Sequence, residues 1–232
     1  MFYLGKFLSK VQHILTKAQL FILMTPVILF SLTIHEYSHG KVASLLGDDT
    51  AKSLGRLSFN PLRHLDPLGI IVFYFLGFGW AKPVPVDWRN FLNPRKDLMY
   101  VSLAGPISNV GLAVLCGFFI RIISPNENWI LFCILAFGVY INVALAIFNM
   151  LPIYPLDGSS ILKGLVSSEL AAKLGSLDRI VGFLLFGIFL LDHFMHIGIL
   201  WSIIGLPILI VVSFLTQEAF PLLQQVLIMS FG

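Results

Sequence analysis

Five long apolar runs follow one another along this chain, and short polar or basic segments separate them. Their residue ranges are 18–46, 98–123, 129–150, 179–197 and 199–216. About 20 apolar residues in helical form cross the hydrocarbon core of a bilayer, and such a helix satisfies its backbone hydrogen bonds internally. The pattern therefore predicts an all-α polytopic membrane protein with about five to six transmembrane segments.

A sixth apolar run, residues 68–80 (LGIIVFYFLGFGW), is too short and too rich in glycine for a full span. It lies between basic, turn-rich stretches, so we expect a re-entrant or β-hairpin element there. Residues 81–88 (AKPVPVDW) alternate apolar residues with proline. This alternation is typical of an edge strand, because proline has no N–H group to donate to a neighbouring strand and is therefore rare in central strands. We therefore expect region 47–97 to fold back near the membrane surface.

The same pattern predicts a single transmembrane domain over residues 18–216. Residues 1–17 contain three lysines within an apolar run. We expect them to form an amphipathic segment at the membrane surface, not a cleaved signal peptide. Residues 217–232 are expected to be a C-terminal tail. No polar stretch is long enough for a separate soluble domain.

The composition agrees with a membrane protein. The 232 residues are 57% hydrophobic and 12% charged, whereas about 25% of a soluble domain is charged, and the mean hydropathy is +0.90. The net charge of +3 gives no information about nucleic acid, because the basic residues of this chain indicate membrane topology. The expected partner is a lipid bilayer, and no nucleic-acid partner is expected. Cys116 and Cys133 lie in apolar runs, so we interpret them as packing residues and not as a disulfide or metal pair.

The placement of lysine and arginine favours one orientation. If residues 68–80 return to the side from which they start, eleven of the 15 basic residues face the cytoplasm and four face outside. This bias follows the positive-inside rule, although the three lysines in residues 1–17 oppose it. If residues 68–80 cross fully, the bias largely disappears. We therefore predict five full spans and one re-entrant element, in a multi-pass protein of the plasma membrane with its site toward the cytoplasm.

A cluster of ionisable residues interrupts the first apolar run. Residues 18–34 carry no charge, and His35-Glu36-Tyr37-Ser38-His39 follow directly. Ionisable groups at membrane depth are costly and usually functional. On a helix, His35 and His39 share a face and can bind one metal ion, while Glu36 can act as a general base beside them. The alternative is a hydrogen-bonded polar cluster between helices.

A third ligand is available after the apolar run 129–150. Catalytic zinc sites use three protein ligands and leave one position open. The run ends in NMLPIYPLDG, residues 149–158, and Asp157 returns there to the depth of the two histidines. Pro152 and Pro155 interrupt the helix, so the backbone can bend and direct this carboxylate. The alternative is an ordinary Asp-Gly turn at the end of a helix.

Five sequence blocks, in this order, resemble the site-2 proteases, a family of intramembrane zinc metalloproteases. The blocks are HEYSHG at 35–40, GRLSFNPLRHLDPLG at 55–69, GWAKPVPVDWRNFLNPRKD at 79–97, AGPISN at 104–109 and NMLPIYPLDG at 149–158. The resemblance is closest to the short forms that lack an inserted PDZ domain and a CBS domain. It implies cleavage of peptide bonds within or near transmembrane segments of other membrane proteins.

The resemblance also implies roles for individual residues. His35, His39 and Asp157 would bind one Zn²⁺ per chain, and Glu36 would activate water. Asn149 matches the family's asparagine before the aspartate, so it would contact the substrate carbonyl or the oxyanion.

Two further positions match the family's small-residue helix motif. Gly105 would allow close helix packing, and Asn109 would donate or accept a hydrogen bond near the site. The alternative for both Asn109 and Asn149 is that they only bridge helices.

Substrate binding raises a physical problem, because a transmembrane helix hides its peptide bonds in internal hydrogen bonds. The extended stretch Lys82, Pro83, Val84 and Pro85 can pair with an unwound substrate strand by β-addition. We therefore expect the partner to be a membrane protein with helix-breaking residues in its transmembrane segment.

Two other functions are compatible with the same residues. A membrane zinc transporter needs metal ligands along a path open to both sides, and Asp192, His193 and His196 are a second small cluster that we interpret as interfacial polar residues. A catalytically inactive scaffold that binds membrane helices is the other alternative.

Overall fold

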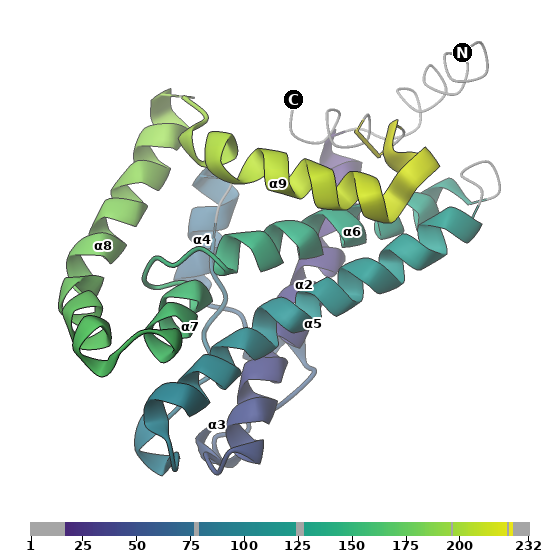
Figure 1. Cartoon of the computed structure of the whole chain (residues 1–232). Helices are drawn as coiled ribbons and strands as arrows, with labels where there is room; N and C mark the ends of the chain where they lie inside the picture. Colours follow the sequence, from purple (N-terminus) through teal and green to yellow (C-terminus); the bar gives the residue numbers. More distant parts are fainter. Residues whose placement is uncertain (1–16, 77–78, 124–127, 196, 222, 225–232) are drawn as a thin grey trace.

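The computed structural model describes most of the chain. The described residues are 17–76, 79–123, 128–195, 197–221 and 223–224. The predicted N-terminal amphipathic segment and most of the C-terminal tail lie outside them. Within the described residues the chain is almost entirely helical (Figure 1).

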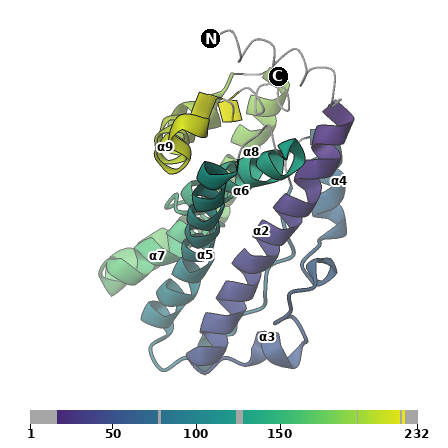
Figure 2. The same cartoon turned by 90° about the vertical axis from the view of Figure 1, so that its right-hand side faces the viewer.

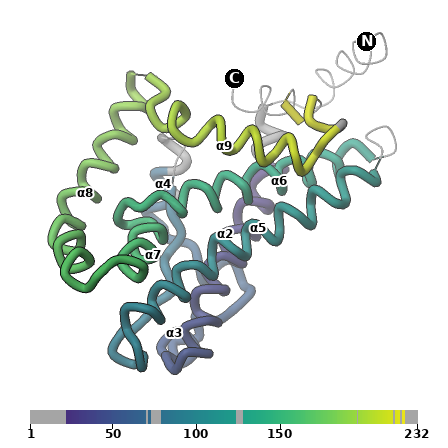
Figure 3. Tube along the Cα trace, in the orientation of Figure 1, coloured from purple at the N-terminus to yellow at the C-terminus, as the bar shows by residue number. Residues whose placement is uncertain are grey.

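Three long helices form the centre of the molecule. They are α2 (Lys17–Leu45), α5 (Pro94–Ile122) and α6 (Trp129–Asn149), and each packs against the other two. A fourth helix, α9 (Ile199–Thr216), lies across α6 and α5 (Figure 3). Their shared apolar core includes Phe132 and Val139 from α6 and Ile208 and Val212 from α9, all at most 1% exposed.

Two further helices, α7 and α8, lie at one edge. The short helix α7 (Asp157–Leu165) packs against α5, and α8 (Ser168–Met195) contacts only α7 and α9 to any extent (Figures 1 and 2). Among the described residues of α8, Leu185 is the one buried side chain. Most of the apolar surface of α8 is therefore turned away from the other helices.

Four helices among the described residues are long and apolar enough to cross a membrane, and they are α5, α6, α8 and α9. These helices indicate an integral membrane protein. The helix α2 has 29 residues but is not among those four, so five spans stay a prediction. The helix α8 begins at Ser168, well before the apolar run, because an amphipathic stretch with a Glu169–Lys173 ion pair of 3.1 Å extends it.

The region between α2 and α5 differs from the predicted hairpin. Residues Pro67–Leu76 form a helix, α4, and the described residues contain a single antiparallel bridge, Leu65 to Ala81, in place of a β-ladder. The Asp66 side chain accepts hydrogen bonds from the backbone N–H groups of Leu68 and Gly69, and Pro67 begins the helix, a combination that favours a helical start. The expectation of a β-hairpin and a regular edge strand was therefore wrong.

Shorter elements complete this region. They are α3 (Thr50–Ser53) and two 3-10 turns, η1 (Pro61–Arg63) and η2 (Trp88–Asn90). A further turn, η3 (Gln217–Ala219), follows α9.

The two ends of the α4 segment lie side by side. The backbone N–H of Lys82 donates to the carbonyl oxygen of His64 at 2.8 Å. A Cβ atom on Gly69 would lie only 2.2 Å from the carbonyl oxygen of Trp80, so only glycine permits this approach. The chain therefore leaves along α4 and returns to its starting point.

Candidate metal centre

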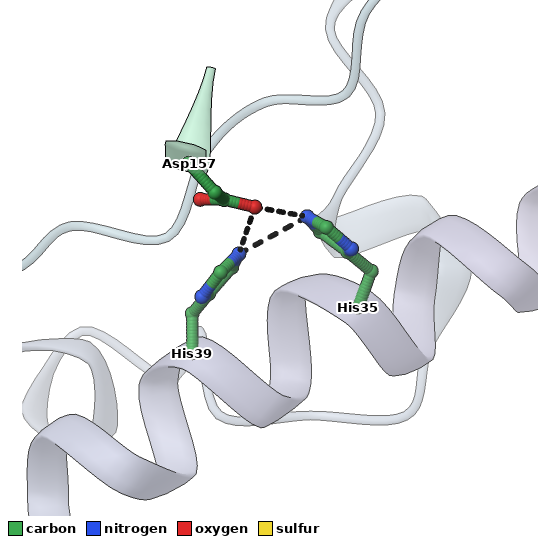
Figure 4. Close-up of side chains that lie close together, drawn as sticks. All are labelled: His35, His39 and Asp157. Atoms are coloured by element: carbon green, nitrogen blue, oxygen red, sulfur yellow. Dashed lines mark hydrogen bonds and ion pairs between the residues drawn. The ribbon is translucent and has the colours of Figure 1, made fainter. Parts of the chain in front are cut away.

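Three potential ligand atoms meet between α2 and the start of α7 (Figure 4). The Nε2 atoms of His35 and His39 are 3.0 Å apart. The Oδ2 atom of Asp157 lies 3.3 Å from the first and 3.4 Å from the second. The structure thus brings together the three residues that the sequence proposed as ligands, although more than a hundred positions separate Asp157 from the histidines.

The triangle has the size that zinc requires. Ligands about 2.0–2.1 Å from a tetrahedral zinc ion lie about 3.3 Å from one another. The two nitrogen–oxygen distances exceed the usual range for a direct N–H···O hydrogen bond, about 2.7–3.2 Å. Moreover, Oδ2 of Asp157 is buried and has no hydrogen-bond partner among the described residues. These observations fit a shared metal ion better than direct hydrogen bonds.

The other ring nitrogens indicate which tautomer each histidine adopts. Nδ1 of His39 lies 2.7 Å from the carbonyl oxygen of Val101, which can only accept, so this nitrogen carries the proton. Nδ1 of His35 lies 2.6 Å from Oδ1 of Asn109 and is likewise the donor. Both Nε2 lone pairs then face the Asp157 carboxylate, and such a set of acceptors needs a cation among them.

Gly105 allows α5 to approach the two imidazole rings. A Cβ atom at this position would lie 2.4 Å from Nε2 of His39 and 2.5 Å from Cε1 of His35. The sequence predicted that Gly105 permits close helix packing, and the structure shows that this packing is against the side chains of His35 and His39, the two proposed ligands.

Asp157 is the first residue of α7, so its position depends on the turn before it. A Cβ atom on Gly158 would lie 2.3 Å from the carbonyl oxygen of Leu151. Glycine at this position therefore lets the chain turn tightly enough to point Asp157 at α2.

The proposed base, Glu36, contacts the segment that follows α4. Its Oε2 atom accepts a hydrogen bond of 2.8 Å from the backbone N–H of Val84. A Cβ atom on Gly40 would lie 3.0 Å from Cγ1 of Val84, so the helix and this segment are in close contact. Val84 therefore lies at the site itself.

The neighbours of Val84 are fixed from the other side. The Arg56 guanidinium donates to the carbonyl oxygens of Lys82 at 2.8 Å and Pro83 at 3.3 Å. Lys82 and Pro83 are exposed, and Pro85 is partly buried. Arg56 thus holds the segment at the position where Val84 meets Glu36.

Asn149 lies at the end of α6, and its recorded hydrogen bond is within its own helix. Its Nδ2 donates to the carbonyl oxygen of Leu145 at 3.0 Å. No hydrogen bond joins Asn149 to His35, His39 or Asp157 in the described part of the chain. Its proposed contact with substrate stays a prediction.

Comparison with known proteins identifies the family of this chain. Residues 119–191 match the model of "Peptidase family M50". The chain is 40% identical over 167 residues to "Putative zinc metalloprotease YwhC" of Bacillus subtilis, and the match covers 68% of this chain and 75% of that protein. The chain belongs to peptidase family M50, the site-2 proteases.

Other relatives of this M50 peptidase carry similar names. "Putative zinc metalloprotease Rip2" of Mycolicibacterium smegmatis is 30% identical over 154 residues, which are 64% of this chain and 59% of that protein. "Putative zinc metalloprotease MJ0611" of Methanocaldococcus jannaschii is 39% identical over 97 residues, 41% of this chain and 49% of that protein. No solved structure matches. The names of these relatives imply zinc, and within the described residues of this M50 peptidase His35, His39 and Asp157 form a group that could bind it.

Several residues that support the site were not singled out from the sequence. Asn142 and Ser31 are buried beside Asn109 and hydrogen-bonded to it or to each other. An asparagine in the middle of the apolar run 129–150 was a usable signal, since polar residues inside spanning helices usually bond to another helix. Asp48 was missed for a different reason, because its partners lie in a loop.

Asp48 ties the end of α2 to the loop after Val84. Its carboxylate is fully buried and accepts from the backbone N–H of Asp87 and the side chain of Asn90, both at 2.8 Å. Burial alone would raise the pKa of Asp48, but hydrogen bonds from Thr50, Asn90 and Asp87 outweigh it and hold the pKa below its usual value. The Val84 segment is therefore anchored on both sides.

Proposed function

We propose that this M50 peptidase hydrolyses peptide bonds within or near the transmembrane segments of other membrane proteins. One observation carries the proposal: His35 and His39 from the apolar helix α2 meet Asp157 from α7 in a triangle of zinc-binding size. The three ligands leave a position open for water or a peptide carbonyl, which is the arrangement of a catalytic site.

The chemistry would be divided among few groups. Zinc held by His35, His39 and Asp157 would supply Lewis acidity and a lowered pKa for water. Glu36 would accept the proton of the attacking water on its carboxylate and deliver it to the leaving amine nitrogen. Asn149 retains an amide hydrogen beyond the one bonded to Leu145 and would donate it to the developing oxyanion.

The substrate strand would lie along the Val84 segment. Pro83 and Pro85 have no N–H group, and the N–H of Lys82 is bonded to the carbonyl oxygen of His64. The N–H groups of this segment that a substrate strand could use therefore belong to Val84 and Val86, which are two residues apart. In an extended backbone alternate residues point to one edge, and that edge faces Glu36. A substrate strand can add to this edge by main-chain hydrogen bonds, with its carbonyl taking the Val84 N–H from Glu36.

A substrate must first unwind to pair in this way. We expect faster cleavage of transmembrane segments that carry glycine, proline or asparagine near the cytoplasmic end. Purified enzyme incubated with two model substrates, one with a Gly-Pro pair and one with an all-leucine span, tests this expectation. Equal cleavage rates would contradict it.

The membrane arrangement proposed here has the site toward the cytoplasm of the plasma membrane. The side-by-side ends of the α4 segment support a re-entrant element, because a chain that returns to its starting point need not cross. Single cysteines at Asp49 and Arg95, labelled in intact cells with an impermeant maleimide, should react from the same side. Labelling from opposite sides would exclude re-entry.

Zinc content and turnover test the function directly. Wild-type protein should hold about one zinc ion per chain, and Asp157→Ala should lose it, since two histidines alone make an incomplete site. Glu36→Gln should retain zinc and lose peptide hydrolysis, because the amide cannot accept the proton. Hydrolysis by Glu36→Gln at the wild-type rate would refute the assigned base.

A zinc transporter receives less support from the same structure. Within the described residues there is one group of three potential metal ligands. Asp192 instead accepts the backbone N–H of Ile199 at 2.8 Å, at the junction of α8 and α9, and His196 lies outside the described residues. Zinc uptake into liposomes without peptide hydrolysis would favour the transporter. An inactive scaffold would show zinc but no hydrolysis of any membrane substrate.

A further inference from the structure

Behind the metal ligands lies a buried polar chain that joins three helices. Asn109 of α5 is fully buried, Asn142 of α6 is 2% exposed and Ser31 of α2 is 1% exposed. Nδ2 of Asn109 lies 2.8 Å from Oδ1 of Asn142, and Nδ2 of Asn142 lies 2.9 Å from Oγ of Ser31 and 2.8 Å from the carbonyl oxygen of Gly138. The chain ends at Nδ1 of His35.

The direction of each hydrogen bond in this chain follows from main-chain carbonyl groups, which can only accept. The Ser31 carbonyl oxygen lies 3.4 Å from Nδ2 of Asn109, and the Gly138 carbonyl oxygen makes the shorter contact, 2.8 Å from Nδ2 of Asn142. The Gly138 carbonyl can only accept, so Asn142 must turn its Nδ2 toward it. Oδ1 of Asn142 then faces Asn109 and requires the Nδ2 of Asn109 as donor. Oδ1 of Asn109 is thereby left to accept from Nδ1–H of His35. Main-chain carbonyl groups thus dictate which nitrogen of His35 carries the proton.

We propose that Asn142 is a positioning residue for the metal site, which holds Asn109 in the one orientation that keeps the Nε2 lone pair of His35 facing Asp157. Without Asn142, only the longer contact of 3.4 Å between Nδ2 of Asn109 and the carbonyl oxygen of Ser31 opposes a 180° rotation of the Asn109 amide. That rotation would present Nδ2 to His35 and favour the wrong tautomer. A ligand histidine depends on such a second hydrogen bond for its tautomer and orientation. The inference rests on the proposed zinc site.

His39 provides an internal contrast. Its Nδ1 bonds directly to the backbone carbonyl of Val101 at 2.7 Å, so no side chain can reverse it. The two histidines therefore differ in how they are held: His39 by main chain alone, and His35 through two amides that must both point the correct way.

The test compares three variants by zinc affinity, measured by competition with a chromogenic chelator, and by thermal unfolding of the zinc-free protein in detergent. Asn142→Leu keeps the approximate shape of the side chain but removes both of its hydrogen-bonding groups, Oδ1 and Nδ2. It should weaken zinc about 10-fold, the lower end of the loss seen when partners behind metal ligands are removed.

Two matched variants separate orientation from stability. Asn142→Asp still offers an oxygen to Nδ2 of Asn109 in either protonation state, so it should keep zinc affinity within about 3-fold even where its unfolding temperature falls. Ser31→Ala deletes a hydrogen bond of the same cluster but leaves the Gly138 carbonyl to orient Asn142, so it should also keep its affinity.

Each outcome has a defined meaning. Wild-type protein without zinc would refute the proposed function, whatever the variants do. Zinc-binding wild type with an unchanged affinity in Asn142→Leu would overturn the positioning role alone. An equal loss of affinity in Asn142→Leu, Asn142→Asp and Ser31→Ala would also overturn it, because the effect would then follow packing and not orientation.

Discussion

The α2–α5–α6 bundle and the helix α8 differ in how their surfaces are used. In the bundle, helices approach so closely that Gly105 contacts both imidazole rings and that asparagines bond across three helices. In α8, Leu185 is the one buried side chain among those described, and Phe183 is 73% exposed. The bundle around His35 and His39 is therefore tightly packed, whereas α8 makes few contacts with the other helices.

The link between these two regions passes through the helix that carries Asp157. Lys163 of α7 binds Asp178 of α8 with Nζ–O distances of 2.5 and 2.7 Å, and both side chains are partly buried. Beyond this ion pair, α8 contacts the bundle through the ring of Phe189, which lies edge-on to Phe148 of α6 with 5.7 Å between the ring centroids. The comparison shows that the residues of the candidate metal centre lie in the closely packed bundle, whereas most side chains of α8 are not buried against it.

The strongest test of this comparison places a methyl group on one glycine of the bundle. Gly105→Ala should reduce zinc affinity about 100-fold or more, because its Cβ would overlap His39 and His35 and push the ligands apart. Zinc affinity by chelator competition measures it. Gly111→Ala on the same helix is the control, since a Cβ there meets nothing within 4 Å. Equal affinities in the two variants would show that the bundle is less rigid than described.

A smaller effect is expected at the link between the regions. Asp178→Asn should lower stability by about 1 kcal/mol, which is about 2–4 °C in unfolding temperature, and should speed amide exchange in α8 while leaving zinc affinity unchanged. The control is Lys173→Met, which removes an exposed pair with Glu169 and should change stability by less than about 0.5 kcal/mol. Loss of zinc in Asp178→Asn would mean that α8 helps to hold Asp157.

The smallest effect is expected within α8 itself. Gly187→Ala should be neutral or stabilising by up to about 1 kcal/mol, because a Cβ at this position meets nothing within 4 Å and alanine favours the helix. Thermal unfolding and peptide hydrolysis measure the outcome. A clear loss of stability would reveal a contact of α8 that the structure does not contain.

Much of the architecture was accessible from the sequence because apolar length determines where a spanning helix ends. The runs 129–150 and 199–216 agree with α6 and α9 to within a residue. The start of α8 was placed too late, because an amphipathic stretch continues a helix without adding to the apolar run. The sequence favoured a hairpin in place of α4, because ten mostly apolar residues with a glycine show neither a helical nor a strand period. The hydrogen bond that the Asp66 side chain accepts from Leu68 stabilises the start of the helix.

The sequence predicted the proposed ligands of the candidate site but not the residues that position them. His35 and His39 could be paired by helical spacing, and Asp157 by the number of ligands zinc needs. Asn142 could not be given its role, because its effect depends on which groups of Asn109 and Gly138 face it in three dimensions. The bond between Glu36 and Val84 likewise joins positions whose proximity no sequence pattern indicates.

That bond has a consequence for the many membrane proteins that such an enzyme meets and must leave intact. Under the proposed function, this bond would keep Glu36 occupied until a substrate carbonyl accepts the Val84 N–H, and the carbonyls of an intact helix are already bonded within that helix. A transmembrane helix that stays fully hydrogen-bonded would therefore not be cleaved. Under the proposed function, local unwinding of a substrate's own transmembrane helix would decide whether it is cleaved, and no recognition sequence would be needed.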